Sequence, residues 1–239
     1  MGGHRDIWIM NSDGTNRKQL TSNAEQNFEP SVSPDGHYIA FFSTRAGLGD
    51  LWRIEIDGGD PRQLTRGLLT WQPSWSPDGQ WILFITYPDW KIWRVPVEGG
   101  TPIAVTDRPS YRPVISPDGK WMACFYSDSK AEVSSKTVYN LAILPVAGGA
   151  PLRTFPFRGE NSVFTLLQWT PDGRAILYNA TNHNVSNIWS QPVDGGSPRQ
   201  VTNFKDASIN SFAWSRDAHW LVCSRGTVNS DAVLITQIK

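Results

Sequence analysis

The sequence has little cysteine, no excess of charge of either sign and no long hydrophobic run. Only 2 of its 239 residues are cysteines, which excludes a framework of several disulfides. Its 22 lysines and arginines balance 22 aspartates and glutamates. Phosphate neutralisation needs clustered positive charge, and a membrane span needs roughly 20 apolar residues. We therefore expect neither a nucleic-acid partner nor insertion into a membrane.

Glycine, proline and tryptophan are plentiful, with 20, 17 and 12 residues respectively. This composition is typical of many short strands joined by tight turns. All-β folds of roughly 200–250 residues often form one unit. We therefore predict a single all-β domain over residues 1–239.

A tetrapeptide repeat divides the chain into similar units. Ser33-Pro34-Asp35-Gly36 returns at residues 76–79, 116–119 and, with threonine first, 170–173; an altered copy occupies 215–218. Proline fixes φ at the second turn position, aspartate bonds its own backbone and glycine accepts a positive φ, so this tetrapeptide closes a hairpin. Gly-Gly pairs at residues 58–59, 99–100, 148–149 and 195–196 follow the first four copies and mark a second turn in each unit. Each unit therefore reads as a four-stranded antiparallel meander of about 40–45 residues.

Stacking such units around an axis gives a β-propeller, because one blade cannot bury both of its faces. The strand count predicts five blades, and six blades with one incomplete is the alternative. The strands near Asp6–Met10 and Ala232–Ile238 compete for one place, and the start in mid-blade leads us to expect a fragment of a longer parent. Ten tryptophans recur in register and are predicted to pack between blades: Trp75, Trp169, Trp214, Trp81, Trp121, Trp220, Trp8, Trp52, Trp93 and Trp189.

The repeated motifs carry a family resemblance over nearly the whole chain. Ser-Pro-Asp-Gly, Asp50-Leu51-Trp52 and Gly-Gly followed by Gln63-Leu64-Thr65 resemble the repeats of TolB-type β-propellers. The resemblance implies a bacterial, periplasmic interaction platform, a sensor attached to kinases or winged-helix regulators, or an accessory domain of peptidases. Residues 212–231 look like the last blade of the sensor type, although Arg216 and Ala218 replace the proline and glycine of the turn.

The cysteines and histidines do not suggest catalysis or metal binding. Cys124 and Cys223 share one repeat position in non-adjacent blades, too far apart for a disulfide, so we predict two buried free thiols. His37 and His219 follow hairpin turns and are predicted to be exposed. No histidine has a second ligand at metal-binding spacing. We predict no metal and no cofactor.

An enzymatic role is not expected from the remaining motifs. No Gly-x-Ser-x-Gly elbow is present. Five-bladed glycosidases need a pair of acids at the mouth of the channel. The equivalent positions, where the first strands enter their blades, hold only one acid: Glu29, Gln72, Arg112, Leu166 and Ser211. The alternative is a propeller that gates a peptidase or acts on glycans.

Two tryptophans, Trp71 and Trp90, lie outside the packing register and indicate a binding face. Antiparallel connectivity brings the long loops to one face, and aromatic and arginine side chains dominate binding hot spots. We predict a recognition or sensor propeller that binds a protein or small ligand there. The alternative explanation for these aromatic side chains is that they only pack the loops. The insertion Ser127–Thr137 is either a mobile loop or a contact arm. A monomer is expected, with strand exchange as a route to oligomers. The predicted binding residues are Phe28, Glu29, Trp71, Gln72, Trp90, Tyr111 and Arg112.

Overall fold

The computed structural model describes residues 5–22, 26–129, 133, 137–157, 165–215 and 217–227, and every regular element in this part of the chain is a β-strand. Four antiparallel sheets have four strands each, in chain order. The first blade comprises β3 (Asn27–Val32), β4 (Tyr38–Ser43), β5 (Asp50–Glu55) and β6 (Arg62–Gln63); the second β7 (Leu69–Trp75), β8 (Trp81–Tyr87), β9 (Ile92–Pro96) and β10 (Ile103–Ala104); the third β11 (Ser110–Ile115), β12 (Trp121–Ser127), β13 (Tyr139–Pro145) and β14 (Arg153–Phe155); and the fourth β15 (Leu167–Trp169), β16 (Ala175–Asn182), β17 (Val185–Pro192) and β18 (Arg199–Gln200).

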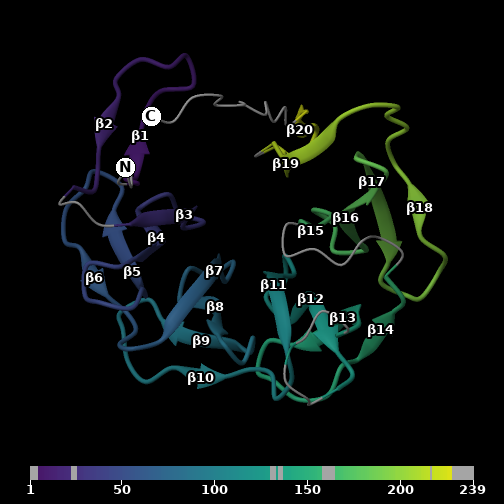
Figure 1. Cartoon of the computed structure of the whole chain (residues 1–239), viewed down its shortest axis with the longest axis horizontal. Helices are drawn as coiled ribbons and strands as arrows, with labels where there is room; N and C mark the ends of the chain where they lie inside the picture. The colour runs from purple at the N-terminus through teal and green to yellow at the C-terminus, as the bar shows by residue number, and fades with distance from the viewer. Residues whose placement is uncertain are drawn as a thin grey trace, which may run out of the picture.

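The blades follow one another around a central opening, with the first strand of each blade innermost (Figure 1). The predicted propeller of four-stranded antiparallel blades is therefore confirmed. The turn chemistry is also as expected. The Ser33 hydroxyl donates to Asp35 Oδ1 at 2.5 Å, His37 N–H donates to the same oxygen at 3.0 Å, and Gly36 has φ 78°.

Aromatic and aliphatic side chains fill the space within and between blades. Phe41, Phe84 and Phe125 are completely buried. Trp75 Nε1 donates to the Ser31 carbonyl at 2.8 Å and Trp169 Nε1 to the Val114 carbonyl at 2.9 Å, so each ties its blade to the preceding one. The other predicted packing tryptophans of the four blades and of the later hairpin are half-buried: Trp214, Trp81, Trp121, Trp52, Trp93 and Trp189.

Two short sheets flank the four blades. One pairs β1 (Trp8–Ile9) with β2 (Lys18–Gln19), and the other pairs β19 (Ser208–Trp214) with β20 (Leu221–Gly226). They are separate sheets that lie at the two ends of the arc (Figure 1). The described residues therefore form four complete blades, and the predicted count of five is not confirmed. The competing strand at Ala232–Ile238 lies outside the described residues.

Three predictions about buried side chains are wrong, and all concern these terminal sheets. Trp8 is 57% exposed and Trp220 is 70% exposed, so neither packs between blades. Cys223 is half-buried, whereas Cys124 is completely buried. The common reason is that a two-stranded sheet offers fewer neighbours than a complete blade. Both cysteines are free thiols, as predicted.

Candidate functional site

Three polar residues hold the same strained position in the first strands of neighbouring blades. Glu29, Gln72 and Arg112 have φ values of 54°, 57° and 56°, and each precedes a proline. Each lies in a β-bulge, where the pairing register of β3, β7 or β11 shifts. A non-glycine residue in the left-handed region costs on the order of 1–3 kcal/mol, and such residues cluster at binding and catalytic sites. The bulges therefore mark this edge of the inner strands as a candidate site.

Hydrogen bonds connect the three residues across the blades. Gln72 N–H donates to Glu29 Oε2 at 2.6 Å, and Arg112 N–H donates to Gln72 Oε1 at 2.7 Å. The bulges of the second and third blades each free a backbone donor that the sheet no longer uses, and the preceding blade supplies the acceptor. The side chains of Glu29 and Gln72 are thereby fixed in orientation.

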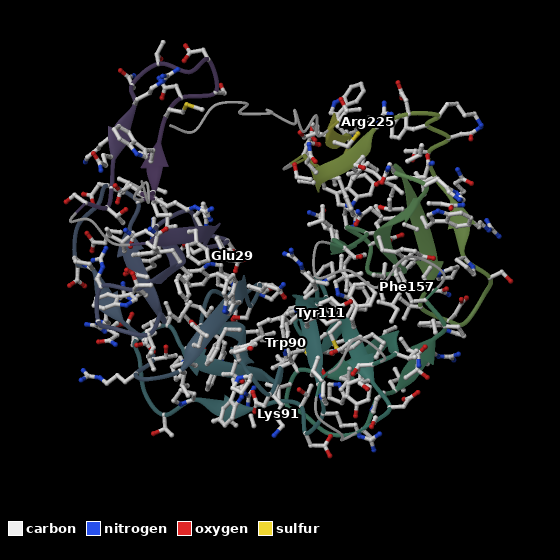
Figure 2. The ribbon with its side chains drawn as sticks, in the orientation of Figure 1. Glu29, Trp90, Lys91, Tyr111, Phe157 and Arg225 are labelled. Carbon is white, nitrogen blue, oxygen red and sulfur yellow. The ribbon has the colours of Figure 1, made fainter. Side chains whose placement is uncertain are left out.

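A pocket of about 390 Å³ opens beside this chain of hydrogen bonds. Aromatic and aliphatic side chains form most of its wall, and Glu29, Gln72 and Arg112 supply its polar edge. Trp71 is 37% exposed and Tyr87 53% exposed. Figure 2 shows Glu29 and Trp90 near the central opening. The lining residues are Glu29, Leu69, Trp71, Gln72, Ile85, Tyr87, Trp90 and Arg112.

Five of the seven predicted binding residues line this pocket, and the other two support it from behind. Phe28 packs against Trp71, with ring centroids 5.3 Å apart. Tyr111 is only 2% exposed, stacks on Phe125 at 4.9 Å and meets Trp90 edge-on at 6.5 Å (Figure 2). Phe28 and Tyr111 thus position the two tryptophans rather than form the wall.

Three apolar residues of the pocket wall were not predicted from the sequence. Leu69 and Ile85 belong to strands that flank the first turn of the second blade, and Tyr87 ends β8. Leu69 pairs directly with Tyr87 in the β7–β8 register. That pairing could have predicted Tyr87 as a wall residue. Tyr87 lies opposite Leu69, and Leu69 is on the same face of the strand as Trp71, two residues further along.

The charges of the pocket come from two side chains. Burial lowers the pKa of Arg112, and the negative charge of Glu29 opposes that shift. Glu29 is the one carboxylate among the lining residues. Within the part of the chain that the structure describes, no group of three histidine, cysteine or acidic side chains is arranged to hold a metal ion. No helix in that part is long and apolar enough to cross a membrane.

Comparison with known proteins agrees with the fold. Residues 1–89 match the TolB beta propeller domain family. The matched segment contains the N-terminal hairpin, the first blade and the first two strands of the second blade, and it is similar to TolB-type β-propeller blades. The chain is 40% identical over 79 residues to the Tol-Pal system protein TolB of Rhizorhabdus wittichii, a match that covers 32% of this chain and 18% of TolB. It is 27% identical over 182 residues to an uncharacterized protein of Agrobacterium fabrum, covering 74% of this chain and 62% of that protein.

Solved structures show the same propeller architecture. A protein of Agrobacterium tumefaciens assigned as TolB superposes with a TM-score of 0.61 and 18% identity, over 80% of this chain and 71% of that one. An oligogalacturonate lyase in complex with manganese gives a TM-score of 0.64 and 15% identity, over 94% of this chain and 65% of that one. At these identities the likeness concerns the fold alone. The chain spans less than two thirds of the length of either sequence relative.

Proposed function

We propose that this TolB-type propeller is a non-catalytic recognition module that binds a protein or small ligand in the pocket beside Trp71 and Trp90. The main support for the proposal is that strained backbone and exposed aromatic side chains occur at the same place. Three non-glycine residues with positive φ, at Glu29, Gln72 and Arg112, border an apolar pocket with exposed aromatic side chains. Concave apolar sites with a few oriented polar groups are typical of ligand binding.

The chemistry of the pocket favours binding over glycoside hydrolysis. Hydrolysis of a glycosidic bond requires two carboxyl groups roughly 5–9.5 Å apart. The described pocket has Glu29 alone, and Oε2 of this residue already accepts the Gln72 N–H. A peptidase-gating propeller is the remaining enzymatic alternative, and it would belong to a longer parent chain. From the resemblance to TolB we propose that the module works in the bacterial periplasm.

Peptides selected from a random library on the intact chain provide the test. Replacing Trp71 or Tyr87 by alanine should weaken the selected peptides by about 2 kcal/mol or more, roughly 30-fold, the usual scale of a hot spot. Trp220→Ala is the matched control, because this exposed tryptophan lies in the β19–β20 hairpin and does not line the pocket. The proposal would be overturned if the selected peptides bound all three variants as tightly as they bind the unsubstituted chain.

A further inference from the structure

We find a second candidate site at one repeat position, the residue two before the tryptophan of the third strand (Trp8, Trp52, Trp93 and Trp189, with Ala142 in the third blade). Asp6, Asp50 and Asn187 hold this position in the N-terminal hairpin, the first blade and the fourth blade. The second blade has Lys91 there. In the third blade Asn140 holds the position, and its amide donates to Asp128 at 3.0 Å.

In three units the oxygen of this side chain accepts a hydrogen bond from a threonine hydroxyl. Thr21 donates to Asp6 at 2.9 Å, Thr65 to Asp50 at 2.9 Å and Thr202 to Asn187 at 3.0 Å. Asp50 also accepts the N–H groups of Gly67 and Leu68, at 3.3 and 3.2 Å. The oxygen thus organises the loop that leads to the next blade.

The same threonine is present in the second blade without that acceptor. Thr106 Oγ1 accepts the Ile92 N–H at 2.9 Å, as Thr65 Oγ1 accepts the Leu51 N–H at 2.9 Å. Among the residues that the structure describes, no oxygen accepts the Thr106 hydroxyl hydrogen or the Arg108 N–H. Lys91 instead points to Asp89, with 3.5 Å between Nζ and Oδ2. The second blade thus keeps the threonine and the N–H at the position of Gly67, has Pro109 in place of the donor Leu68, and has a cation in place of the carboxylate.

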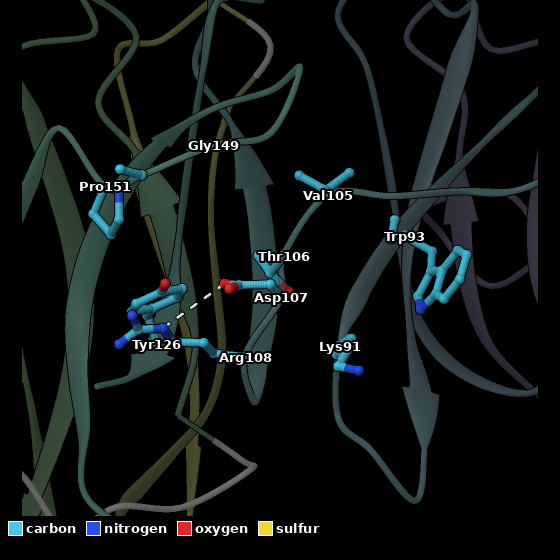
Figure 3. A pocket seen from close by; sticks show the side chains of 11 residues that line it. Lys91, Trp93, Val105, Thr106, Asp107, Arg108, Tyr126, Gly149 and Pro151 are labelled. Atoms are coloured by element: carbon cyan, nitrogen blue, oxygen red, sulfur yellow. Dashed lines mark ion pairs between the residues drawn. The ribbon is translucent and has the colours of Figure 1, made fainter. Parts of the chain in front are cut away.

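A cleft of about 650 Å³ lies at this position, between the second and third blades. In Figure 3 the side chains of Thr106 and Asp107 lie between Lys91 on one side and Arg108 on the other. Arg108 Nε is 3.8 Å from Asp107 Oδ1. The lining therefore carries two cations against one carboxylate. Apolar walls come from Trp93, Val105, Ala104, Ala150 and Pro151.

We infer that this cleft binds the carboxylate of an external ligand in the place that Asp50 fills in the first blade. The acid group accepts the Thr106 hydroxyl and the Arg108 N–H, and the charges of Lys91 and Arg108 flank it. Hydrogen bonds to an ionised acceptor are roughly twice as strong as those between neutral groups. The volume beyond the acid group suits an apolar remainder against Trp93 and Pro151. The inference is independent of the pocket at Trp71.

Titration of the isotopically labelled full chain with phenylacetate tests the inference. Saturable shifts should appear at the amides of residues 91–92 and 106–108, and the uncharged isostere phenylacetamide should bind about tenfold more weakly. A blocked peptide, acetyl-Ala-Asp-Phe-Ala-amide, forms a second arm. Tighter binding of the peptide would assign the carboxylate to a protein partner, and tighter binding of phenylacetate to a free organic acid.

Two substitutions and a control complete the experiment. Lys91→Asp restores the repeat, so it should abolish phenylacetate binding and raise the melting temperature. Lys91→Met removes the charge alone and should weaken binding about tenfold, which keeps the test valid if Lys91→Asp folds poorly. Lys120→Met, at an exposed turn lysine, should have no effect. Equal binding of phenylacetate and phenylacetamide, or unchanged affinity in Lys91→Met, would overturn the inference.

Discussion

The backbone N–H of Gln72 donates to the Glu29 carboxylate across the boundary between the first and second blades, at 2.6 Å. A side chain that begins one blade therefore fixes the bulge of the next. Gln72 repeats the arrangement with Arg112 at 2.7 Å. The rim of the pocket is consequently held by hydrogen bonds between blades and does not depend on a loop of its own.

Removing the Glu29 acceptor should destabilise the propeller. Glu29→Ala leaves the half-buried Gln72 N–H without its partner, which typically costs about 1–3 kcal/mol. Urea unfolding of the full chain measures the change. Glu29→Gln is the matched control, because its amide oxygen can still accept the Gln72 N–H, and it should lose less than about 1 kcal/mol. Equal losses in the two variants would show that the hydrogen bond contributes little.

The altered fifth turn offers a stabilising substitution. Ala218 has φ 59° where the intact turns have glycine, as at Gly79 with φ 69°. Ala218→Gly should raise the unfolding free energy by about 1 kcal/mol, because glycine carries no penalty for the left-handed conformation. The reverse change, Gly79→Ala, should lower it by about as much, since a Cβ there meets open space and only the backbone cost remains. Opposite signs in denaturant titrations are the expected result.

The turn aspartates predict a loss of stability in acid. Hydrogen bonds from the Ser76 hydroxyl and the Gln80 N–H lower the pKa of Asp78. The hydroxyl and N–H donors at the equivalent positions of the next two turns lower the pKa of Asp118 and Asp172. Their stabilising effect is complete above the ordinary carboxyl pKa of 3.8 and is lost as the pH falls through the lower folded-state values. Unfolding midpoints should be flat between about pH 7 and 5 and decline below about pH 4. Asp78→Asn should make that decline shallower.

The two thiols should react at different rates in the folded protein. Burial raises the pKa of the Cys124 thiol and also blocks access to it, whereas Cys223 is half-buried. A colourimetric thiol reagent at pH 8 should therefore titrate one thiol in the native chain and two after denaturation. Cys223→Ser is the control and should leave no native reactivity. Rapid modification of both native thiols would contradict the burial of Cys124.

The repeat in the sequence predicted the four-stranded blades, and the residues around it predicted five of the eight that line the pocket. Register alone placed Glu29, Gln72 and Arg112 at equivalent positions, because antiparallel meanders send equivalent residues to one face. The positive φ of these residues was not predictable, since residues before proline usually favour extended conformations. The burial of Tyr111 beneath Trp90 was also not predicted. In the sequence both residues are expected near loops, and only the packing of the folded chain shows which side chain forms the pocket wall and which one supports it.

The terminal hairpins show where reasoning from repeats fails. Trp8 and Trp220 match half-buried tryptophans in register, yet they are exposed. Register predicts which side of a strand a side chain occupies, but burial depends on whether a neighbouring blade covers that side. The same dependence explains why Cys223 differs from Cys124.

Trp90 and Lys91 are adjacent in sequence, but they line different pockets, one beside the inner strands and the other between two blades. The turn that carries them spans only the few residues between β8 and β9. An insertion or deletion there would displace both walls together. During evolution, point substitutions can therefore change one pocket without the other. A change in the length of this turn would alter both pockets at once.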